Sequence, residues 1–302
     1  ILRRMAMQSY CLQIDEEGRE KTAHIRDGFP VAMYETHPRR YPIGYTIWHW
    51  HWEIQFCWVV QGEIEFYVEE NRYHLTKGQG IFINRGTLHM AKAVHSEEDA
   101  YICMDIDSGL LEETAVLGDR YVSPVVANKA IPCLLFTEQA DREIIQALSC
   151  SYEDWSARRP GYEMCVMAQL WRIWHRICGR VEGMAQHGNL GIRPSRTKEM
   201  IRYLHLHYQQ DIMLDDIAHA VHMSGEECCR FFKGITGSTI FGYLREYRIK
   251  KSLELLDHGQ MTIGEVSEAV GFHSVSYFCQ CFRKKMRMTP KQYQKRANIA
   301  ME

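Results

Sequence analysis

One pattern occurs twice in the last third of this 302-residue chain. It consists of a short amphipathic segment, a tight turn, a serine, and a second segment that ends in basic residues. The first copy spans residues 214–233 around Ser224, and the second spans residues 263–285 around Ser274. A serine in front of a helix accepts a hydrogen bond from an unpaired backbone N–H of the first turn. The pattern therefore predicts two helix-turn-helix units about fifty residues apart.

The turn between the two helices differs between the copies. The second copy has Gly271 where a left-handed backbone is expected, a conformation that glycine adopts freely. The first copy has His222 there, and a larger side chain in that conformation costs some free energy. Glu227 stands three residues after Ser224, at the position that completes a capping box. We expect one relaxed turn and one slightly strained turn, each followed by a capped helix.

Charge is unevenly distributed along the chain. Residues 193–297 carry 17 Lys and Arg against 11 Asp and Glu, whereas residues 1–192 carry 19 against 26. A basic segment that also contains two helix-turn-helix units indicates a polyanionic partner. Successive major grooves on one face of DNA are roughly 34 Å apart, so two such helices on one rigid body predict DNA binding.

Helical periodicity separates an inner and an outer face on each second helix. The inner face is predicted to hold Cys228, Phe231, Phe232, Tyr277, Phe278 and Phe282. The outer residues are candidates for contacts with bases: Glu226, Cys229, Arg230, Val275, Ser276 and Gln280, with Cys279 beside them. An Arg can bind guanine through two hydrogen bonds and a Gln can bind adenine in the same way. Candidates for phosphate contacts, which position the protein, are Lys233, Arg283, Lys284 and Lys285.

Residues 196–296 resemble the DNA-binding domain of the AraC-type transcription regulators. The matching positions include Ser224, Arg230-Phe231-Phe232-Lys233, Thr236-Gly237, Ala269-Val270-Gly271-Phe272 and Thr289-Pro290. The resemblance implies a one-component regulator that binds double-stranded promoter DNA as a homodimer. The family usually has a basic residue where Gln280 stands, which implies weaker binding there. In the segment between the units, Arg245 and Arg248 are expected to form internal ion pairs near Glu246.

The first half of the chain has a different pattern. Short alternating apolar stretches separated by turns, such as residues 63–69, predict a β-sandwich or small barrel over residues 20–107. Helical spacing over residues 138–150 and 163–178 predicts a helical hairpin. The predicted class is α+β: a barrel domain (1–136), the hairpin (137–182), a linker (183–194) and an all-α DNA-binding domain (195–298).

The sequence His49-Trp-His51-Trp-Glu53-Ile-Gln55, followed later by His89, resembles the cupin barrel motifs. On an extended strand His49, His51 and Gln55 share one face, and closing a barrel brings His89 toward them. Metal-binding cupins have Glu where Gln55 stands, and an amide is a weaker ligand than a carboxylate. No cofactor is therefore expected to be required, while a divalent ion on the three histidines is the less favoured alternative.

We expect the barrel to bind a small-molecule effector. The candidate residues are His49, His51, Gln55, His89, Tyr45 and Tyr67, and the AraC-type resemblance implies a carbohydrate as the ligand class. The apolar face of the hairpin, with Met167, Trp171 and Trp174, predicts either a dimer surface or a cover for the barrel.

Two other functions compete with regulation by a ligand. One is a metal-dependent cupin enzyme, and the other is a constitutive DNA-binding protein whose barrel only dimerises. The chain is not expected to be an enzyme. Its 11 cysteines form no CxxC pair, and no apolar run is long enough for a membrane span, so a cytoplasmic protein with reduced thiols is expected.

Overall fold

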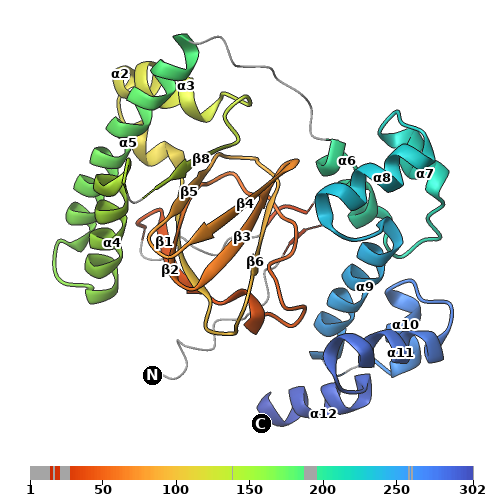
Figure 1. Cartoon of the computed structure of the whole chain (residues 1–302). Coiled ribbons are helices and arrows are strands. Elements are labelled where there is room, and N and C mark those ends of the chain that lie inside the picture. Colours follow the sequence, from red (N-terminus) through yellow and green to blue (C-terminus); the bar gives the residue numbers. More distant parts are fainter. Residues whose placement is uncertain are drawn as a thin grey trace. The chain divides into compact units, whose positions relative to one another are not determined.

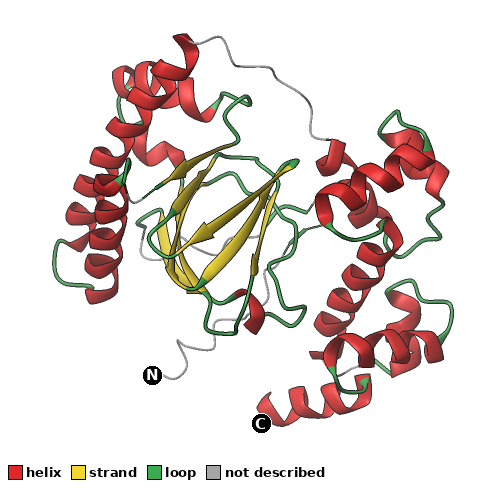
Figure 2. Cartoon of the chain, viewed as in Figure 1, coloured by secondary structure: helices red, strands yellow, loops and turns green. Residues whose placement is uncertain are grey.

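The computed structural model describes residues 14–15, 18–20, 28–137, 139–186, 196–257, 259 and 261–301. It divides into two compact units. One unit comprises Arg19–Arg40 and Thr46–Pro194, and the other comprises Ser195–Glu302 together with Ile1–Gly18 and Tyr41–Tyr45. The first unit combines strands with helices, whereas the elements of Ser195–Glu302 are all helical (Figure 2). The predicted combination of a strand-rich N-terminal part and an all-α C-terminal part is confirmed.

The strands of the first unit form two antiparallel sheets (Figure 1). The larger sheet has the order β1 (Val31–Thr36), β7 (Ala100–Ile106), β2 (Ile54–Gln61), β5 (Gly80–Ile83), β8 (Cys133–Phe136). The smaller sheet has the order β4 (Asn71–Thr76), β3 (Glu63–Val68), β6 (His89–Ala93). The sequence predicted a β-sandwich or a small barrel, and the resemblance implied a cupin-like barrel. In the described residues the hydrogen-bonded ladders end at the edge strands, so the arrangement is two sheets and not a closed ring.

Strand alternation builds a core between the two sheets. Ile64, Phe66 and Val68 of β3 are buried on one face, as their period of two predicts. They belong to the same apolar cluster as Cys57 and other residues of β2 and β7. Because partners in an antiparallel pair share a face, His89, which pairs with Val68, is also placed on this inner side.

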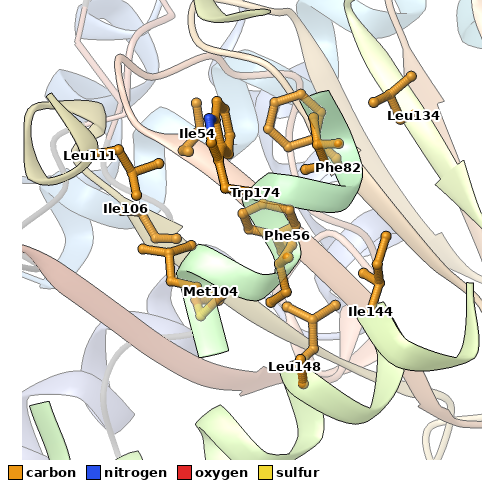
Figure 3. Close-up of a cluster of buried hydrophobic side chains, with 14 of the residues drawn as sticks. Ile54, Phe56, Phe82, Met104, Ile106, Leu111, Leu134, Ile144, Leu148 and Trp174 are labelled. Carbon is orange, nitrogen blue, oxygen red and sulfur yellow. The ribbon is translucent and has the colours of Figure 1, made fainter. Parts of the chain in front are cut away.

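The opposite face of the larger sheet is covered by the helical hairpin of α4 (Arg142–Ala157) and α5 (Tyr162–Gln186). Figure 3 shows Trp174 of α5 among side chains of the sheet, and its indole is 1% exposed. Met167 and Trp171 are partly buried against the same cluster. This apolar face therefore serves as the cover that the sequence left open as an alternative to a dimer surface.

Shorter helical pieces complete the first unit: η1 (Pro38–Arg40), η2 (Ser108–Leu111), α2 (Ala115–Leu117), η3 (Gly118–Val122) and α3 (Ser123–Val126). Helix α5 continues to Gln186, beyond the predicted hairpin end at residue 182. Residues 187–194 of the predicted linker lie outside the described residues. Within the described ranges, no helix combines the length and the hydropathy that a membrane span requires.

The second unit contains the two predicted helix-turn-helix units. Its helices are α6 (Arg196–His207), α7 (Leu214–Ala220), α8 (Gly225–Thr236), α9 (Ile240–Asp257), α10 (Ile263–Ala269), α11 (Val275–Met286) and α12 (Pro290–Met301). The first helix-turn-helix motif is formed by α7 and α8, and the second motif by α10 and α11. Helix α9 connects the two.

Helix α9 also forms hydrogen bonds with the loop that follows α6. The Arg248 guanidinium donates to the carbonyl oxygens of Tyr208 (2.7 Å) and Gln210 (2.8 Å). The internal role predicted for Arg248 is thus present, but its partners are backbone carbonyls and not Glu246. Glu246 instead forms an ion pair with Lys285 of α11 (3.0 Å), because that side chain reaches it across the helix contact. These bonds tie α9 both to the α6–α7 loop and to the second helix-turn-helix unit.

Candidate DNA-binding helices and effector site

The turns of the two helix-turn-helix units share one backbone geometry. His222 has a φ of 52° and Gly271 a φ of 85°, so both adopt the left-handed conformation that the sequence predicted. In each turn the next residue donates its N–H to the carbonyl five residues back, at 3.0 Å from Met223 and 2.9 Å from Phe272. The first turn therefore has the same geometry as the second, although His222 has a Cβ atom that makes this backbone conformation strained.

Caps define the same length for the helices α8 and α11. Ser224 accepts from the Glu227 N–H (3.3 Å) and donates its own N–H to the Glu227 carboxylate (3.0 Å), so the predicted capping box is confirmed. These hydrogen bonds hold the pKa of Glu227 below its ordinary value. In α11, Ser274 accepts from the Tyr277 N–H (3.3 Å). Both helices end in a left-handed residue, Gly237 or Arg287.

This common frame places the base-contact candidates at equivalent positions. Arg230 and Gln280 each lie six residues after the capping serine, and Glu226 and Ser276 each lie two residues after it. All six candidates are exposed: Glu226, Cys229, Arg230, Val275, Ser276 and Gln280. The core side chains Cys228, Phe232, Phe278 and Phe282 are fully buried. The two helices thus present polar and small side chains on the face opposite to their core.

The phosphate-contact candidates are not equivalent to one another. Lys233, Arg283 and Lys284 are exposed, whereas Lys285 is partly buried. The Lys285 ammonium is 3.0 Å from the Glu246 carboxylate. Lys285 is therefore held by an internal ion pair, and the other three cations are turned to solvent.

Three side chains of these helices depart from the predicted inner and outer faces. Tyr277 was expected inside but is 46% exposed, and Phe231 is only partly buried. Cys279 was expected outside but packs against the core. Phe278 and Phe282, four residues apart, form the apolar stripe, and Tyr277 lies about 100° to one side of it. That spacing was the available signal for adding Tyr277 to the DNA-facing candidates.

The three histidines of the first unit come together as the sequence predicted. One ring nitrogen from each of His49, His51 and His89 lies within 4.8 Å of the others, and each residue is 1–4% exposed. Two backbone hydrogen bonds between His49 and His89 (3.0 and 2.9 Å) join their segments. These three residues define the His cluster.

Each ring of the His cluster is oriented by a backbone carbonyl. The Nδ1 atoms of His49, His51 and His89 are 2.7, 2.9 and 2.9 Å from the carbonyl oxygens of residues 47, 53 and 87. A carbonyl only accepts hydrogen bonds, so each Nδ1 carries a proton, and in the neutral form of each imidazole the Nε2 atom has the lone pair. Burial lowers the pKa of His49, although the Glu20 carboxylate opposes that shift.

Gln55 does not belong to the His cluster. Its amide nitrogen donates to the Asp105 carboxylate (2.8 Å), and its carbonyl oxygen accepts from the Cys57 thiol (3.3 Å). A different carboxylate, which the sequence analysis missed, lies beside the cluster. Glu20 Oε2 is 3.6 Å from His49 Nε2, and the Glu20 N–H donates to the Trp50 carbonyl (2.8 Å). No motif connects residue 20 with residues 49–89, so only the folded chain reveals it.

The two predicted effector tyrosines lie elsewhere. Tyr67 neighbours Val68 on β3 and therefore points to the opposite face from His89. Its hydroxyl donates to Glu65 (2.8 Å), and burial followed by this bond raises the pKa of Tyr67 to about 12. Tyr45 belongs to the unit that contains the DNA-binding helices, where its hydroxyl donates to Glu246. Tyr67 therefore lies apart from the His cluster, and the candidate effector residues are divided between the two compact units.

An open cleft of about 900 Å³ lies beside α4 and α5 in the first unit. Its lining includes Tyr121, Trp171, His175 and Arg180. None of the predicted effector residues lines it. The cleft is accessible to a small molecule, whereas the His cluster is enclosed.

Comparison with known proteins covers both units. The family model of a helix-turn-helix domain matches residues 217–296, and that of an AraC-like ligand binding domain matches residues 34–173. The uncharacterized HTH-type transcriptional regulator YdeC of Bacillus subtilis is 34% identical over 284 residues, which cover 93% of this chain and 97% of YdeC. The regulatory protein PocR of Salmonella typhimurium is 31% identical over 104 residues, 34% of each chain. The apo structure of ToxT from Vibrio cholerae, 14% identical with a TM-score of 0.43, covers 89% of this chain and 98% of ToxT. The chain belongs to the AraC family of transcription regulators, with an N-terminal ligand-binding domain and a C-terminal helix-turn-helix DNA-binding domain.

Proposed function

We propose that this regulator binds promoter DNA through α8 and α11 and changes that binding when a small molecule occupies its N-terminal domain. The observation that carries the proposal is the common frame of the two helices. Both start at a capping serine and end at a left-handed residue, and between these points their outer faces are exposed.

Arg230 and Gln280 make the principal base contacts in this proposal. They occupy equivalent positions on α8 and α11, and both are exposed. Arg230 suits a guanine and Gln280 suits an adenine, because each side chain can form two hydrogen bonds with one base edge. The neighbouring candidates are Glu226, Cys229, Val275 and Ser276. Ser276 can donate or accept, and the Val275 side chain suits a thymine methyl group.

Lys233, Arg283 and Lys284 contact phosphates in this proposal. Their exposed cations lie toward the ends of the two helices, beyond the base-contact candidates. Such contacts fix the position of the protein on the duplex without specifying sequence. Lys285 contributes less, since the Glu246 carboxylate already holds its ammonium.

The effector acts by binding one arrangement of the domains more tightly than another. A ligand without such a difference in affinity would shift nothing. The carbohydrate class comes from the AraC-type resemblance and enters the test as one group of candidate ligands. The open cleft beside α4 and α5 offers the room that the enclosed His cluster lacks. The proposed role of this protein is regulation and not catalysis. Because it acts on DNA, we propose that it is located in the cytoplasm.

Homodimerisation completes the proposal, because two copies double the DNA contacts and read two half-sites. The apolar face of the hairpin around Trp174 is used inside the protomer. A dimer therefore has to use another surface, such as the outer side of α5, where Met164 is 77% exposed.

Binding of the full chain to its own promoter fragment tests the proposal. Fluorescence anisotropy is measured with and without a panel of sugars and other small metabolites, and light scattering gives the mass of the free and bound protein. The proposal predicts sequence-specific binding, at least about a fivefold affinity change with one ligand, and a dimer on the fragment. Binding that no ligand alters would favour a constitutive protein. Turnover of a ligand without specific DNA binding would favour an enzyme.

A further inference from the structure

We propose that Arg248 is a positioning residue for DNA recognition, and that it fixes the separation between the two DNA subsites that α8 and α11 read. The inference rests on the proposed function, in which these two helices enter the DNA. It adds a second level of specificity, because the number of base pairs between two subsites is selected by the rigidity of the protein and not by its base contacts. Arg248 lies on α9, the helix that connects the two helix-turn-helix motifs.

The first step is the pair of hydrogen bonds between Arg248 and the loop from α6 to α7. We call this loop, residues 208–213, the bridge loop. The Arg248 Nε donates to the Tyr208 carbonyl (2.7 Å), and its Nη2 donates to the Gln210 carbonyl (2.8 Å). A guanidinium holds its donors in a rigid planar fork, so two bonds from one group fix the bridge loop in both distance and orientation. A lysine ammonium would keep the charge but lose the fork.

The second step is the contact between the bridge loop and the turn of the second helix-turn-helix motif. A Cβ atom at Gly271 would lie 2.7 Å from the Tyr208 carbonyl oxygen and 2.9 Å from that of Gln209. It would also lie 3.1 Å from the guanidinium carbon of Arg248. The backbone of this turn, the bridge loop and the guanidinium therefore pack closely against one another.

Two weaker contacts join the same segments. The Arg248 guanidinium lies 5.9 Å from the centre of the Phe272 ring, close to the limit of about 6 Å for a cation–π contact. The Asp211 carboxylate pairs with the His273 ring, but these side chains are 76% and 73% exposed. Exposed pairs of this kind contribute little to stability. The two hydrogen bonds of the partly buried Arg248 are therefore the strongest polar link that the described residues show here.

The third step is the connection from the bridge loop to the first helix-turn-helix motif. Helix α7 begins at Leu214, directly after the bridge loop, and the Met213 N–H donates to the Asp216 carboxylate (2.8 Å). A Cβ atom at Gly225, the first residue of α8, would lie 3.0 Å from the Leu214 side chain, so the starts of the two helices are in contact. A shift of the bridge loop would therefore move α7 and α8 together.

The bridge loop gives the two motifs a second attachment to each other. The first attachment is α9, which packs on α8 through the rings of Tyr243 and Phe232, 5.6 Å apart. The Glu246–Lys285 ion pair joins α9 to α11. Two attachments prevent the rotation about α9 that one would allow. A rigid connection gives a high effective concentration of the second recognition helix at the matching separation and a low one elsewhere, whereas a looser connection reduces this difference.

DNA fragments with altered separation test the inference. The two subsites are located on the promoter fragment by footprinting, and one base pair is inserted between them. The insertion moves the second subsite by about 3.4 Å and rotates it by about 35° around the duplex. The wild-type full chain is expected to lose at least about tenfold in affinity on this fragment. Arg248→Lys is expected to bind the native fragment about five- to tenfold more weakly but to lose less than about threefold on the insertion.

Controls separate positioning from charge and from stability. Arg245→Lys makes the same replacement at an exposed arginine of α9 and should retain the wild-type loss on the insertion. A fragment with one subsite should bind the wild type and Arg248→Lys within about twofold of each other, because a single recognition helix needs no fixed separation. A smaller folded fraction would weaken binding to all fragments by one factor and leave their ratio unchanged. If Arg248→Lys does not fold by circular dichroism, Arg248→Gln, which keeps one amide donor, replaces it.

The outcomes distinguish a failure of this inference from a failure of the proposed function. A wild-type protein that binds no fragment specifically would refute the proposed function and this inference with it. Specific wild-type binding that tolerates the inserted base pair would refute the inference alone, as would an Arg248→Lys variant that keeps the full wild-type loss. A reduced loss in Arg248→Lys together with an unchanged loss in Arg245→Lys would support it.

Discussion

His222 and Gly271 occupy equivalent places in the two helix-turn-helix turns, and both have a left-handed backbone, with φ values of 52° and 85°. Glycine adopts this conformation without a steric penalty, whereas a residue with a Cβ atom loses about 1–2 kcal/mol. The first helix-turn-helix motif therefore has backbone strain at His222 that the second motif lacks at Gly271. The two positions respond in opposite ways to a change of side chain.

Replacing the strained histidine should stabilise the domain. His222→Gly is expected to raise the free energy of unfolding by about 0.5–1 kcal/mol, because the relief of strain exceeds the entropy cost of a glycine. Urea unfolding of the full chain, followed by a signal from the second unit, measures this. Ala220→Gly in the neighbouring helix is the control and should lose about 1 kcal/mol. Equal losses in both variants would contradict the assigned strain.

The reverse change should damage the second turn. A Cβ atom at Gly271 would lie 2.7 Å from the carbonyl oxygen of Tyr208 and 2.9 Å from that of Gln209. Gly271→Ala is therefore expected to lower the free energy of unfolding by at least about 2 kcal/mol, from the left-handed backbone and from this contact together. Gly264→Ala is the matched control, since its Cβ would meet nothing closer than 3.9 Å and its φ is ordinary. A wild-type-like Gly271→Ala would show that the loop can move away.

Local chemistry explains what the sequence could predict. The caps at Ser224 and Ser274 and the turn at Gly271 depend on residues within one helical turn, so their patterns are visible in the chain itself. The grouping of the histidines followed from strand alternation. Glu20 and Tyr45 could not be placed in this way, because their partners lie 29 and 201 residues away and no periodic pattern links them.

The arrangement of the strands into two sheets also depends on contacts between residues that are distant in the sequence. Alternation along β3 predicted which side chains point inward, but it contains no information on whether the edge strands pair. Ring closure depends on register and on edge pairing between strands distant in the sequence. The sequence therefore predicted the strand-rich domain but left a sandwich and a barrel open, and the described strands form two sheets.

Base and phosphate contacts should be separable by mutation. Arg230→Ala is expected to cost about 1–3 kcal/mol of binding to the promoter fragment and to relax preference at one base pair. Lys284→Ala should weaken binding to all sequences alike and reduce the salt slope by about 0.9. Anisotropy titrations at several salt concentrations, on matched and single-mismatch fragments, measure both effects.

Lys285→Ala provides the control for the lysine, because its ammonium is engaged by Glu246. It should change the salt slope less than Lys284→Ala does. Indistinguishable behaviour of Arg230→Ala and Lys284→Ala would contradict the division between the two kinds of contact.

DNA should protect one cysteine from alkylation. Cys229 is exposed on the outer face of α8, and Cys165 is exposed on α5, outside the DNA-binding helices. Burial raises the pKa of Cys57 and Cys103, which leaves these thiols unreactive. Mass spectrometry after brief alkylation is expected to show that the promoter fragment slows labelling of Cys229 several-fold. Labelling of Cys165 is the internal reference, and equal protection of both would place α8 away from the DNA.

The stability of the second unit should depend on pH through His205. This side chain of α6 is fully buried, its Nε2 is 2.8 Å from the Tyr243 hydroxyl, and its ring stacks on Tyr247 at 3.9 Å. Burial, followed by the charges of Lys250 and Lys251, lowers the pKa of His205 well below its ordinary value. Below about pH 6.5 the unfolded chain binds a proton that the folded chain does not. The free energy of unfolding should therefore decrease as the pH is lowered, by up to about 1.4 kcal/mol per pH unit.

Urea unfolding at several pH values between 5 and 8, followed by a signal from the second unit, measures this dependence. The quantity to compare is the slope of the free energy of unfolding against pH. His205→Phe keeps a ring against Tyr247 but cannot titrate, so its free energy of unfolding should vary less with pH below about 6.5 than that of the wild type. His219→Gln, a change at an exposed histidine of α7, is the control and should retain the wild-type slope. The prediction fails if His205→Phe keeps the full slope, because another group would then account for the proton uptake.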